Sequence, residues 1–162
     1  MTSCLTVSSP VGDLHLESDG SALTSLRIEG SKSPRVPHQC SSKPDRVLNK
    51  ASKQVSEYFA GKRREFDLPV SVQGTNFQAS IWNQLELIPF GQTRGYGELG
   101  AAIGKPTASR AVGGCVGANP IAIVIPCHRV LASDRRITGF SGGDGISTKQ
   151  WLLNHEGIDF RD

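Results

Sequence analysis

Two short helical patterns joined by a tight turn constrain the fold of this 162-residue chain more than any other feature. The segment 96–104 (YGELGAAIG) has the pattern of a helix that stops at Gly104. The segment 108–118 (ASRAVGGCVGA) has the pattern of a second helix, with Thr107 as its N-cap. Because only the tight turn Gly104-Lys105-Pro106 joins them, the two segments predict a helix-turn-helix.

Capping boxes mark the helices on both sides of this pair. TNFQ at 75–78 opens a helix whose apolar stripe ends before Pro89, and STKQ at 147–150 opens a final helix that runs to Gly157. Ile146 stands where a hydrophobic staple would fix the start of the final helix. The second half of the chain is therefore expected to be mostly helical.

The first half of the chain has a different pattern. Three segments alternate partly between apolar and polar residues and predict short strands at 4–9, 13–18 and 22–30. Prolines and polar residues predict a loop at 31–44, one apolar face predicts a helix at 45–61, and an extended stretch is expected at 66–70. We therefore expect an α+β chain with two domains, 1–73 and 74–162.

The composition is that of an ordinary soluble protein. Apolar residues make up 37% of the chain, and no apolar run approaches the roughly 18 residues that a membrane span needs. Since the N-terminus lacks the pattern of a secretory signal, we expect a location in the cytoplasm, or in the nucleus if the source is eukaryotic. Four cysteines without paired spacing favour free thiols over a disulfide framework.

The charge of the chain is mildly positive, with a net value of +3. Between Arg94 and Lys149 there are seven basic and three acidic residues, which leaves a local surplus of four positive charges. Such a surplus predicts a surface that faces phosphates. A merely solvated surface would have the same composition, so charge alone does not decide between the two.

Pro126-Cys127-His128-Arg129 carries the strongest chemical signal in the chain. A thiol is a good nucleophile only as thiolate, and a nearby imidazole favours that form. Because neighbouring side chains of a strand point to opposite faces, a contact between Cys127 and His128 requires a turn, which Pro126 favours. Glu156 lies where its charge opposes the dipole of the final helix, and it is a candidate to orient His128. A structural Cys-His pair and a solvated Glu156 are the alternatives.

Two further segments suit a nucleic acid or a pocket. Gly113 and Gly114 within the 108–118 helix permit the close approach of another surface, either a packed core or a DNA groove, and Arg110 would face such a groove. Phe140-Ser141-Gly142-Gly143 predict a flexible loop, which either covers a pocket or only connects two elements.

Five motifs in order, RAVGG, Asn119-Pro120, IPCHRV, SGG and HEG, resemble the O6-alkylguanine-DNA alkyltransferases. These are the methylated-DNA–protein-cysteine methyltransferases of direct-reversal repair. The resemblance covers about Phe77 to Gly157, and the first half matches more loosely through SPVG, EYFAG and FDLP. It implies a ribonuclease-H-like N-terminal domain followed by a mostly helical winged helix-turn-helix domain.

The resemblance also implies a reaction. An alkyl group would move irreversibly from O6 of guanine, and also from O4 of thymine, to Cys127 after the base is flipped out of the duplex. His128 would deprotonate Cys127 through a bound water, and Glu156 would orient His128. Asn119 would brace the turn that presents the cysteine, and Tyr96 would donate a proton or hydrogen bond to the leaving guanine. Each molecule would act once.

The same resemblance assigns the binding residues. The base would contact six residues: Tyr96, Cys127, Val130, Phe140, Ser141 and Gly142. DNA would contact another six: Thr107, Ser109, Arg110, Ala111, Gly113 and Gly114, with Arg110 inserted into the duplex. The partner implied is double-stranded DNA containing O6-alkylguanine, bound by a monomer that either acts alone or assembles cooperatively along DNA, without a cofactor.

Some residues depart from the family pattern. Phe140 stands where many relatives have tyrosine, and Cys115 stands where alanine is more usual. Zinc-binding relatives carry ligands that Cys4, Cys40, His15 and His38 do not reproduce at matching spacing, so no metal is expected. Two rival functions stay open: a Cys-His hydrolase that forms a transient acyl-enzyme on Cys127, and a non-catalytic DNA-binding module that senses alkyl lesions.

Overall fold

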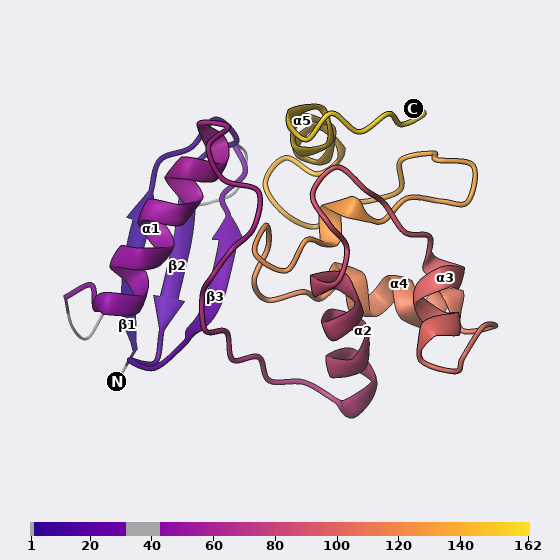
Figure 1. Cartoon of the computed structure of the whole chain (residues 1–162), viewed down its shortest axis with the longest axis horizontal. Coiled ribbons are helices and arrows are strands. Elements are labelled where there is room, and N and C mark those ends of the chain that lie inside the picture. The colour runs from indigo at the N-terminus through magenta and orange to yellow at the C-terminus, as the bar shows by residue number, and fades with distance from the viewer. Residues whose placement is uncertain (1, 32–42) are drawn as a thin grey trace.

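The computed structural model describes residues 2–31 and 43–162, as Figure 1 shows. The predicted loop at 31–44 lies almost entirely outside the described residues, as do Cys40 and His38. The elements in chain order are β1 (Ser3–Val7), β2 (Leu14–Ser18), β3 (Leu23–Ile28), α1 (Arg46–Phe59), α2 (Asn76–Glu86), α3 (Tyr96–Ala102), α4 (Ser109–Gly117), the 3-10 turn η1 (Cys127–Arg129) and α5 (Ile146–His155).

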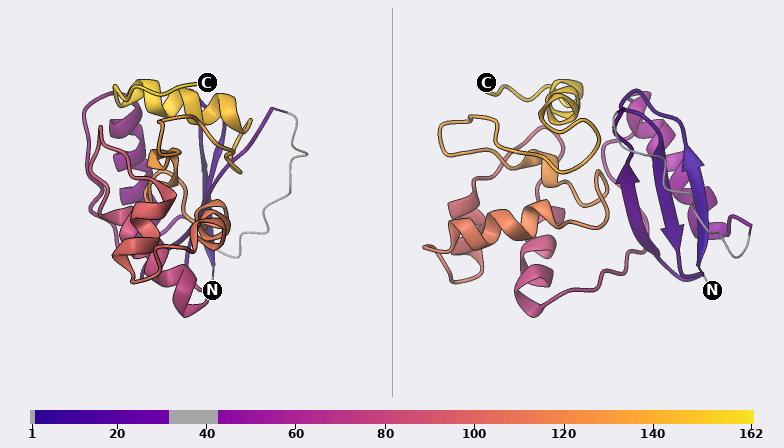
Figure 2. Two further views of the ribbon diagram at one scale, coloured as in Figure 1. Left: turned by 90° about the vertical axis from the view of Figure 1, so that its right-hand side faces the viewer. Right: turned by 180° about the vertical axis from the view of Figure 1, so that it is seen from behind.

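The N-terminal region, residues 2–31 and 43–73, is a small sheet covered by one helix. The sheet is antiparallel with strand order β1-β2-β3, and α1 lies across one of its faces (Figures 1 and 2). Leu14 and Leu16 of β2 are fully buried, as the alternating pattern of that strand predicts. Asp45 caps α1, because its side chain accepts a hydrogen bond of 2.9 Å from the amide of Leu48. The three predicted strands and the predicted helix are confirmed.

The C-terminal region, residues 74–162, packs α2, α3 and α4 against one another. The capping box of Thr75 and Gln78 at the start of α2 is confirmed by both of its hydrogen bonds. The indole of Trp82 on α2 donates a hydrogen bond of 2.9 Å to the carbonyl oxygen of Cys115 on α4. After α3 the chain turns at Gly104, whose φ of 78° suits glycine.

Two predicted helix starts are wrong. The N-cap of α4 is Ala108 and makes no side-chain cap bond, so Thr107 lies one residue before it. The final helix begins at Ile146, so the expected capping box of Ser147 does not form. The reason is local: the hydroxyl of Thr148 accepts a hydrogen bond of 2.9 Å from the amide of Asp144 inside a turn that contains glycines of positive φ. Ile146 is 47% exposed and is no staple.

The two regions share one hydrophobic core, which contains residues of the sheet, of α1 and of every C-terminal helix. They also pair through backbone. The amide of Leu26 on β3 donates a hydrogen bond of 3.0 Å to the carbonyl of Pro120, and the amide of Ala122 returns one of 3.1 Å to Leu26. The amide of Gly143 donates one of 3.0 Å to the carbonyl of Ile28. The edge of the small sheet therefore supports two loops of the C-terminal region.

The cysteines differ in state. Cys115 and Cys127 are free and buried, whereas Cys4 on β1 is disulfide-bonded. The expectation of free thiols throughout the chain is therefore wrong for Cys4.

Candidate active site

Cys127 begins η1 at the end of a tightly turned apolar segment, residues 121–126. Its amide donates a hydrogen bond of 2.8 Å to the carbonyl of Ile125, and Ile123 adopts a φ of 72°, which is rare for a branched residue. Asn119 holds this segment from both ends, since its side chain donates to the carbonyl of Ile125 at 2.7 Å and accepts from the amide of Ile121 at 3.0 Å. The turn leaves Cys127 only 5% exposed.

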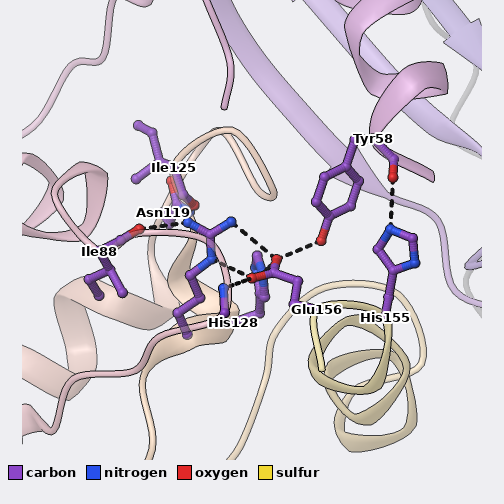
Figure 3. Close-up of polar contacts among 9 residues, drawn as sticks. Tyr58, Ile88, Asn119, Ile125, His128, His155 and Glu156 are labelled. Atoms are coloured by element: carbon purple, nitrogen blue, oxygen red, sulfur yellow. Dashed lines mark hydrogen bonds and ion pairs between the residues drawn. The ribbon is translucent and has the colours of Figure 1, made fainter. Parts of the chain in front are cut away.

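His128 and Glu156 lie against each other in the interior (Figure 3). His128 Nε2 is 2.5 Å from Glu156 Oε2, and both side chains are completely buried. Within the described part of the chain, His128 Nδ1 is buried and has no hydrogen-bond partner. The contact with Glu156 assigns the proton of the neutral ring to Nε2, so Nδ1 is the nitrogen that can accept another proton.

Sequence reasoning missed two partners of Glu156. Arg129 donates to Glu156 Oε1 from Nε at 2.7 Å and to Oε2 from Nη2 at 3.2 Å, and its Nη1 donates to the carbonyl of Ile88 at 2.6 Å. Tyr58, from α1, donates its hydroxyl to Glu156 Oε2 at 2.7 Å (Figure 3). The signal for Arg129 was a charge inside an apolar stretch, and the signal for Tyr58 was a phenol on a buried helical face.

Lys149 is a third residue that sequence reasoning missed. It is 1% exposed, and its Nζ donates a hydrogen bond of 2.7 Å to the carbonyl of Val130. Burial lowers the pKa of Lys149 to about 8, although the neighbouring Cys127 acts in the opposite direction. A buried ammonium here is a positive charge that favours the thiolate of Cys127.

The pKa shifts of the site describe its resting state. Burial raises the pKa of Cys127, against the opposing hydrogen bond from Asn119 and the charge of Lys149. Burial also lowers the pKa of His128, although Glu156 acts to raise it. For Glu156, burial alone would raise the pKa, but the hydrogen bonds and charges of His128 and Arg129 outweigh it and lower the pKa. The resting pair is thus a thiol beside a neutral imidazole that a carboxylate supports.

A pocket of about 360 Å³ opens beside Cys127. It is lined by Tyr96, Gly113, Val116, Gly117, Cys127, Gly139, Phe140 and Ser141. The structure thus brings four of the six expected base contacts to one cavity. The other two lie elsewhere: Val130 is completely buried, and Gly142 packs below the ring of Phe140 and beside Ile28.

Two side chains on the pocket wall are fixed by hydrogen bonds. The hydroxyl of Tyr96 forms one with the hydroxyl of Thr138. Ser141 Oγ donates one of 2.8 Å to the carbonyl of Gly117 at the end of α4. The loop at 140–143 is therefore bound to α4 by Ser141 and to β3 by the hydrogen bond from the amide of Gly143 to Ile28.

The expected DNA contacts lie on α4 and just before it. Thr107, Ser109, Arg110, Ala111 and Gly114 are exposed, and Gly113 is half-buried against the ring of Tyr96. The first turn of α4 contains no acidic residue, so its free amides and its dipole favour an anion. This face of α4 adjoins the pocket, because Gly113 and Gly117 belong to both.

The described residues contain no group of three or more histidine, cysteine, aspartate or glutamate side chains that could hold a metal ion. None of the described helices is long and apolar enough to cross a membrane.

Comparisons with known proteins match nearly the whole chain. Residues 4–72 match a family model described as 6-O-methylguanine DNA methyltransferase, ribonuclease-like domain, and residues 76–158 match the model described as the DNA binding domain of the same methyltransferase. A methylated-DNA–protein-cysteine methyltransferase of Mycobacterium tuberculosis is 44% identical over 93% of this chain and 90% of its own length. One from Methanosarcina acetivorans is 41% identical over 92% and 94%.

Solved structures agree with these sequence matches. A crystal structure of Mycobacterium tuberculosis O6-methylguanine methyltransferase superimposes with a TM-score of 0.80 at 40% identity, covering 96% of this chain and 93% of the other. A crystal structure of Mycobacterium tuberculosis OGT in complex with DNA gives a TM-score of 0.82 at 42% identity, covering 93% and 90%.

Proposed function

The chain belongs to the 6-O-methylguanine DNA methyltransferase family, and on this premise we propose that Cys127 is its alkyl acceptor. It is a methylated-DNA–protein-cysteine methyltransferase of DNA repair. In the proposed reaction the protein takes an alkyl group from O6 of guanine, and also from O4 of thymine. The transfer is irreversible, and each molecule acts once.

The observation that carries the proposal is that Cys127 has a buried histidine–carboxylate pair next to it in sequence and a pocket on its exposed side. Behind the cysteine lies the pair of His128 and Glu156, whose nitrogen and oxygen are 2.5 Å apart. In front of it opens the pocket of about 360 Å³. Cys127 is thus next in sequence to a buried base that a carboxylate supports, and it lines a cavity that α4 also lines.

The chemical step balances within these residues. The thiol proton of Cys127 passes to Nδ1 of His128, directly or through a water, and Glu156 stabilises the imidazolium that forms. The thiolate sulfur then bonds to the alkyl carbon, and the carbon–oxygen bond breaks with its electron pair going to guanine. Tyr96 donates its phenolic proton to the leaving base, which departs as neutral guanine, and the proton taken up by His128 returns to Tyr96 through water. The thioether has no base-catalysed route back, so the protein is consumed.

Reaching the base requires its removal from the duplex, at a cost of a few kcal/mol. We infer that α3 and α4 bind DNA as a helix-turn-helix and that Arg110 enters the space the base leaves. The exposed first turn of α4 suits a phosphate, and the glycines of α4 let the backbone approach closely. Sequence-independent binding follows from contacts of this kind.

The test is an intact-mass measurement after incubation with duplex DNA containing O6-methylguanine. We expect the protein to gain the mass of one methylene, located on the Cys127 peptide, and the reaction to stop at one equivalent per protein. Turnover of an ester or amide without a stable adduct would support the hydrolase instead. DNA binding without any adduct would support the lesion sensor. Either result would overturn the proposal.

A further inference from the structure

Glu156 receives hydrogen bonds from both regions of the molecule. Its Oε1 accepts from Arg129 at 2.7 Å and from the amide of Gly91 at 3.3 Å. Its Oε2 accepts from Tyr58 at 2.7 Å, from Arg129 at 3.2 Å, and shares a proton with His128 at 2.5 Å. Among these partners only Tyr58 belongs to the N-terminal region.

The ring of Tyr58 does not need its hydroxyl for packing. It is completely buried, and its centroid lies 5.2 Å from that of Phe59, 5.6 Å from Phe66 and 6.3 Å from Phe90. A phenylalanine would keep these contacts. The simple explanation for the hydroxyl bond is that a buried phenol needs a hydrogen-bond acceptor, whichever group supplies it. The acceptor it uses, however, is the same oxygen that supports His128.

Nor does Glu156 need Tyr58 to stay charged or oriented. Arg129 already binds both carboxylate oxygens in the two-point geometry that fixes a carboxylate plane. The Tyr58 hydroxyl adds a hydrogen bond to Oε2, and this bond competes with that of His128 for the negative charge of the same oxygen. Burial, followed by the charge of Glu156, raises the pKa of Tyr58, so the hydroxyl keeps its proton and remains a donor.

We propose that Tyr58 is a positioning residue of the alkyl-transfer site: its hydroxyl reaches across from α1 and limits how strongly Glu156 supports His128. This role rests on the proposed function of Cys127 and His128. The N-terminal region supplies no reacting group. Through the Tyr58 hydroxyl it nevertheless sets how readily His128 accepts a proton.

The charges around the pair define the direction of the effect. The pair of His128 and Glu156 is contacted by Tyr58 from α1, Arg129 from η1 and the amide of Gly91, and the charge of Lys149 from α5 also acts on His128. Arg129 and Lys149 make His128 less basic, and Glu156 makes it more basic. Removing the Tyr58 hydroxyl leaves more charge on Oε2 for His128. The pKa of His128 must then rise, because hydrogen bonding to the charged form favours it.

The test is the pH dependence of alkyl transfer by Tyr58→Phe, measured as single-turnover rates with O6-methylguanine duplex. We expect the acid limb of the profile to move up by about half a pH unit, which lowers the rate about threefold on that limb. The rate on the alkaline side should change less than twofold. An acid limb that coincides with that of the wild type would overturn the proposal.

A matched control removes a neighbouring bond between the regions. His155 Nε2 bonds to the backbone carbonyl of Tyr58 at 2.7 Å, and its ring packs edge-on against that of Tyr58 with centroids 4.9 Å apart, whereas the Tyr58 hydroxyl bonds to Glu156. His155→Gln should lower thermal stability at least as much as Tyr58→Phe but leave the acid limb where it is. If both variants move the limb equally, the shift reports the interface and Tyr58 has no specific role.

A second measurement leaves the side chain in place. The chain has two tyrosines, so 3-fluorotyrosine is incorporated site-specifically at position 58 alone, and Tyr96 keeps its hydroxyl for the leaving base. A fluorinated phenol is more acidic and a stronger donor, so fluorination should move the acid limb to lower pH, opposite to Tyr58→Phe. A shift in the same direction, or none, contradicts the proposal even if Tyr58→Phe folds poorly.

The two proposals fail in different ways. If wild-type protein gains no methylene on Cys127, the proposed function fails. If the wild type is alkylated but the variants keep its pH profile, only the role of Tyr58 fails.

Discussion

The two regions of the molecule divide the work of one site unequally. Every proposed reacting group lies in the C-terminal region, from Tyr96 to Glu156. Three of the contacts that the N-terminal region makes bear on the site: Leu26 pairs with the segment that presents Cys127, Ile28 holds the loop at 140–143, and Tyr58 bonds to Glu156. One region therefore carries the chemistry, while the other fixes the positions of its parts. Substitutions in the C-terminal region should therefore remove a chemical step of the transfer, and those in the N-terminal region should change its rate.

Cys127→Ala tests the chemical half of this comparison and has the largest expected effect. Transfer should be abolished, because no other group supplies the nucleophile, while binding to O6-methylguanine duplex should persist in a gel-shift or anisotropy titration. Cys115→Ala is the matched control, since Cys115 is the second free and buried thiol among the described residues. It should still accept one equivalent. An adduct on the Cys127→Ala protein would place the acceptor elsewhere.

His128→Ala should slow transfer near neutral pH by about 100-fold to 10,000-fold, the range that a positioned general base supplies. The wild-type rate should fall only at pH values below the ordinary histidine pKa of 6.5, because burial lowers the pKa of His128. Without the imidazole, the rate should rise with pH through values above 9, where a buried thiol ionises.

The matched control for His128 is His15→Gln in the N-terminal region. It should leave the pH profile unchanged. If the pH profile of His128→Ala coincides with that of the wild type, His128 takes no part in forming the thiolate.

Arg110→Ala should weaken transfer from duplex DNA by about fivefold to 150-fold, equivalent to about 1–3 kcal/mol for a side chain that contacts DNA. Transfer from free O6-benzylguanine should be less affected, because no base must be flipped. Lys62→Ala removes the same charge from the N-terminal region and should change neither rate. Equal losses for Arg110→Ala in both assays would rule out insertion into the duplex.

Gly30→Ala tests the supporting region and has the smallest expected effect on rate. A Cβ at Gly30 would lie 2.3 Å from the carbonyl oxygen of Gly143, so the loop at 140–143 must move. We expect a loss of about 1–3 kcal/mol in the free energy of unfolding and a few-fold slower transfer. Gly97→Ala, on a helix surface with space for the methyl group, should be neutral or stabilising in the same urea titration. Unchanged stability of Gly30→Ala would show that this contact does not support the loop.

Local patterns predicted the elements, but they did not predict where an irregular turn moves the start of a helix. The alternation of Leu14 and Leu16 and the capping box of Thr75 depend on neighbours in sequence, so they could be identified from the chain alone. The start of α5 could not, because it depends on a turn of positive-φ glycines and on Thr148 folding back to Asp144.

The site shows the same limit. The pairing of His128 with Glu156 was anticipated from the resemblance, and the structure places the two in contact. Tyr58 was interpreted only as part of an apolar stripe, since nothing in α1 indicates that a carboxylate 98 residues away is its acceptor. Lys149 was counted as surface charge, yet it is buried beside Cys127, because its ammonium finds an acceptor in the carbonyl of Val130, which nothing in the sequence around Lys149 indicates.

The hydrogen bond from the indole of Trp82 to Cys115 has an optical consequence. Trp82 is one of two tryptophans in the chain, is 3% exposed, and lies behind the helix that we propose enters DNA. The other, Trp151, stacks on His155 beside α1, with ring centroids 5.0 Å apart. The two fluorophores thus lie in different places, Trp82 against α4 within the C-terminal region and Trp151 against Phe59 of α1. With Trp151 replaced by phenylalanine, the emission of Trp82 would follow the docking of α4 in real time, without any attached dye.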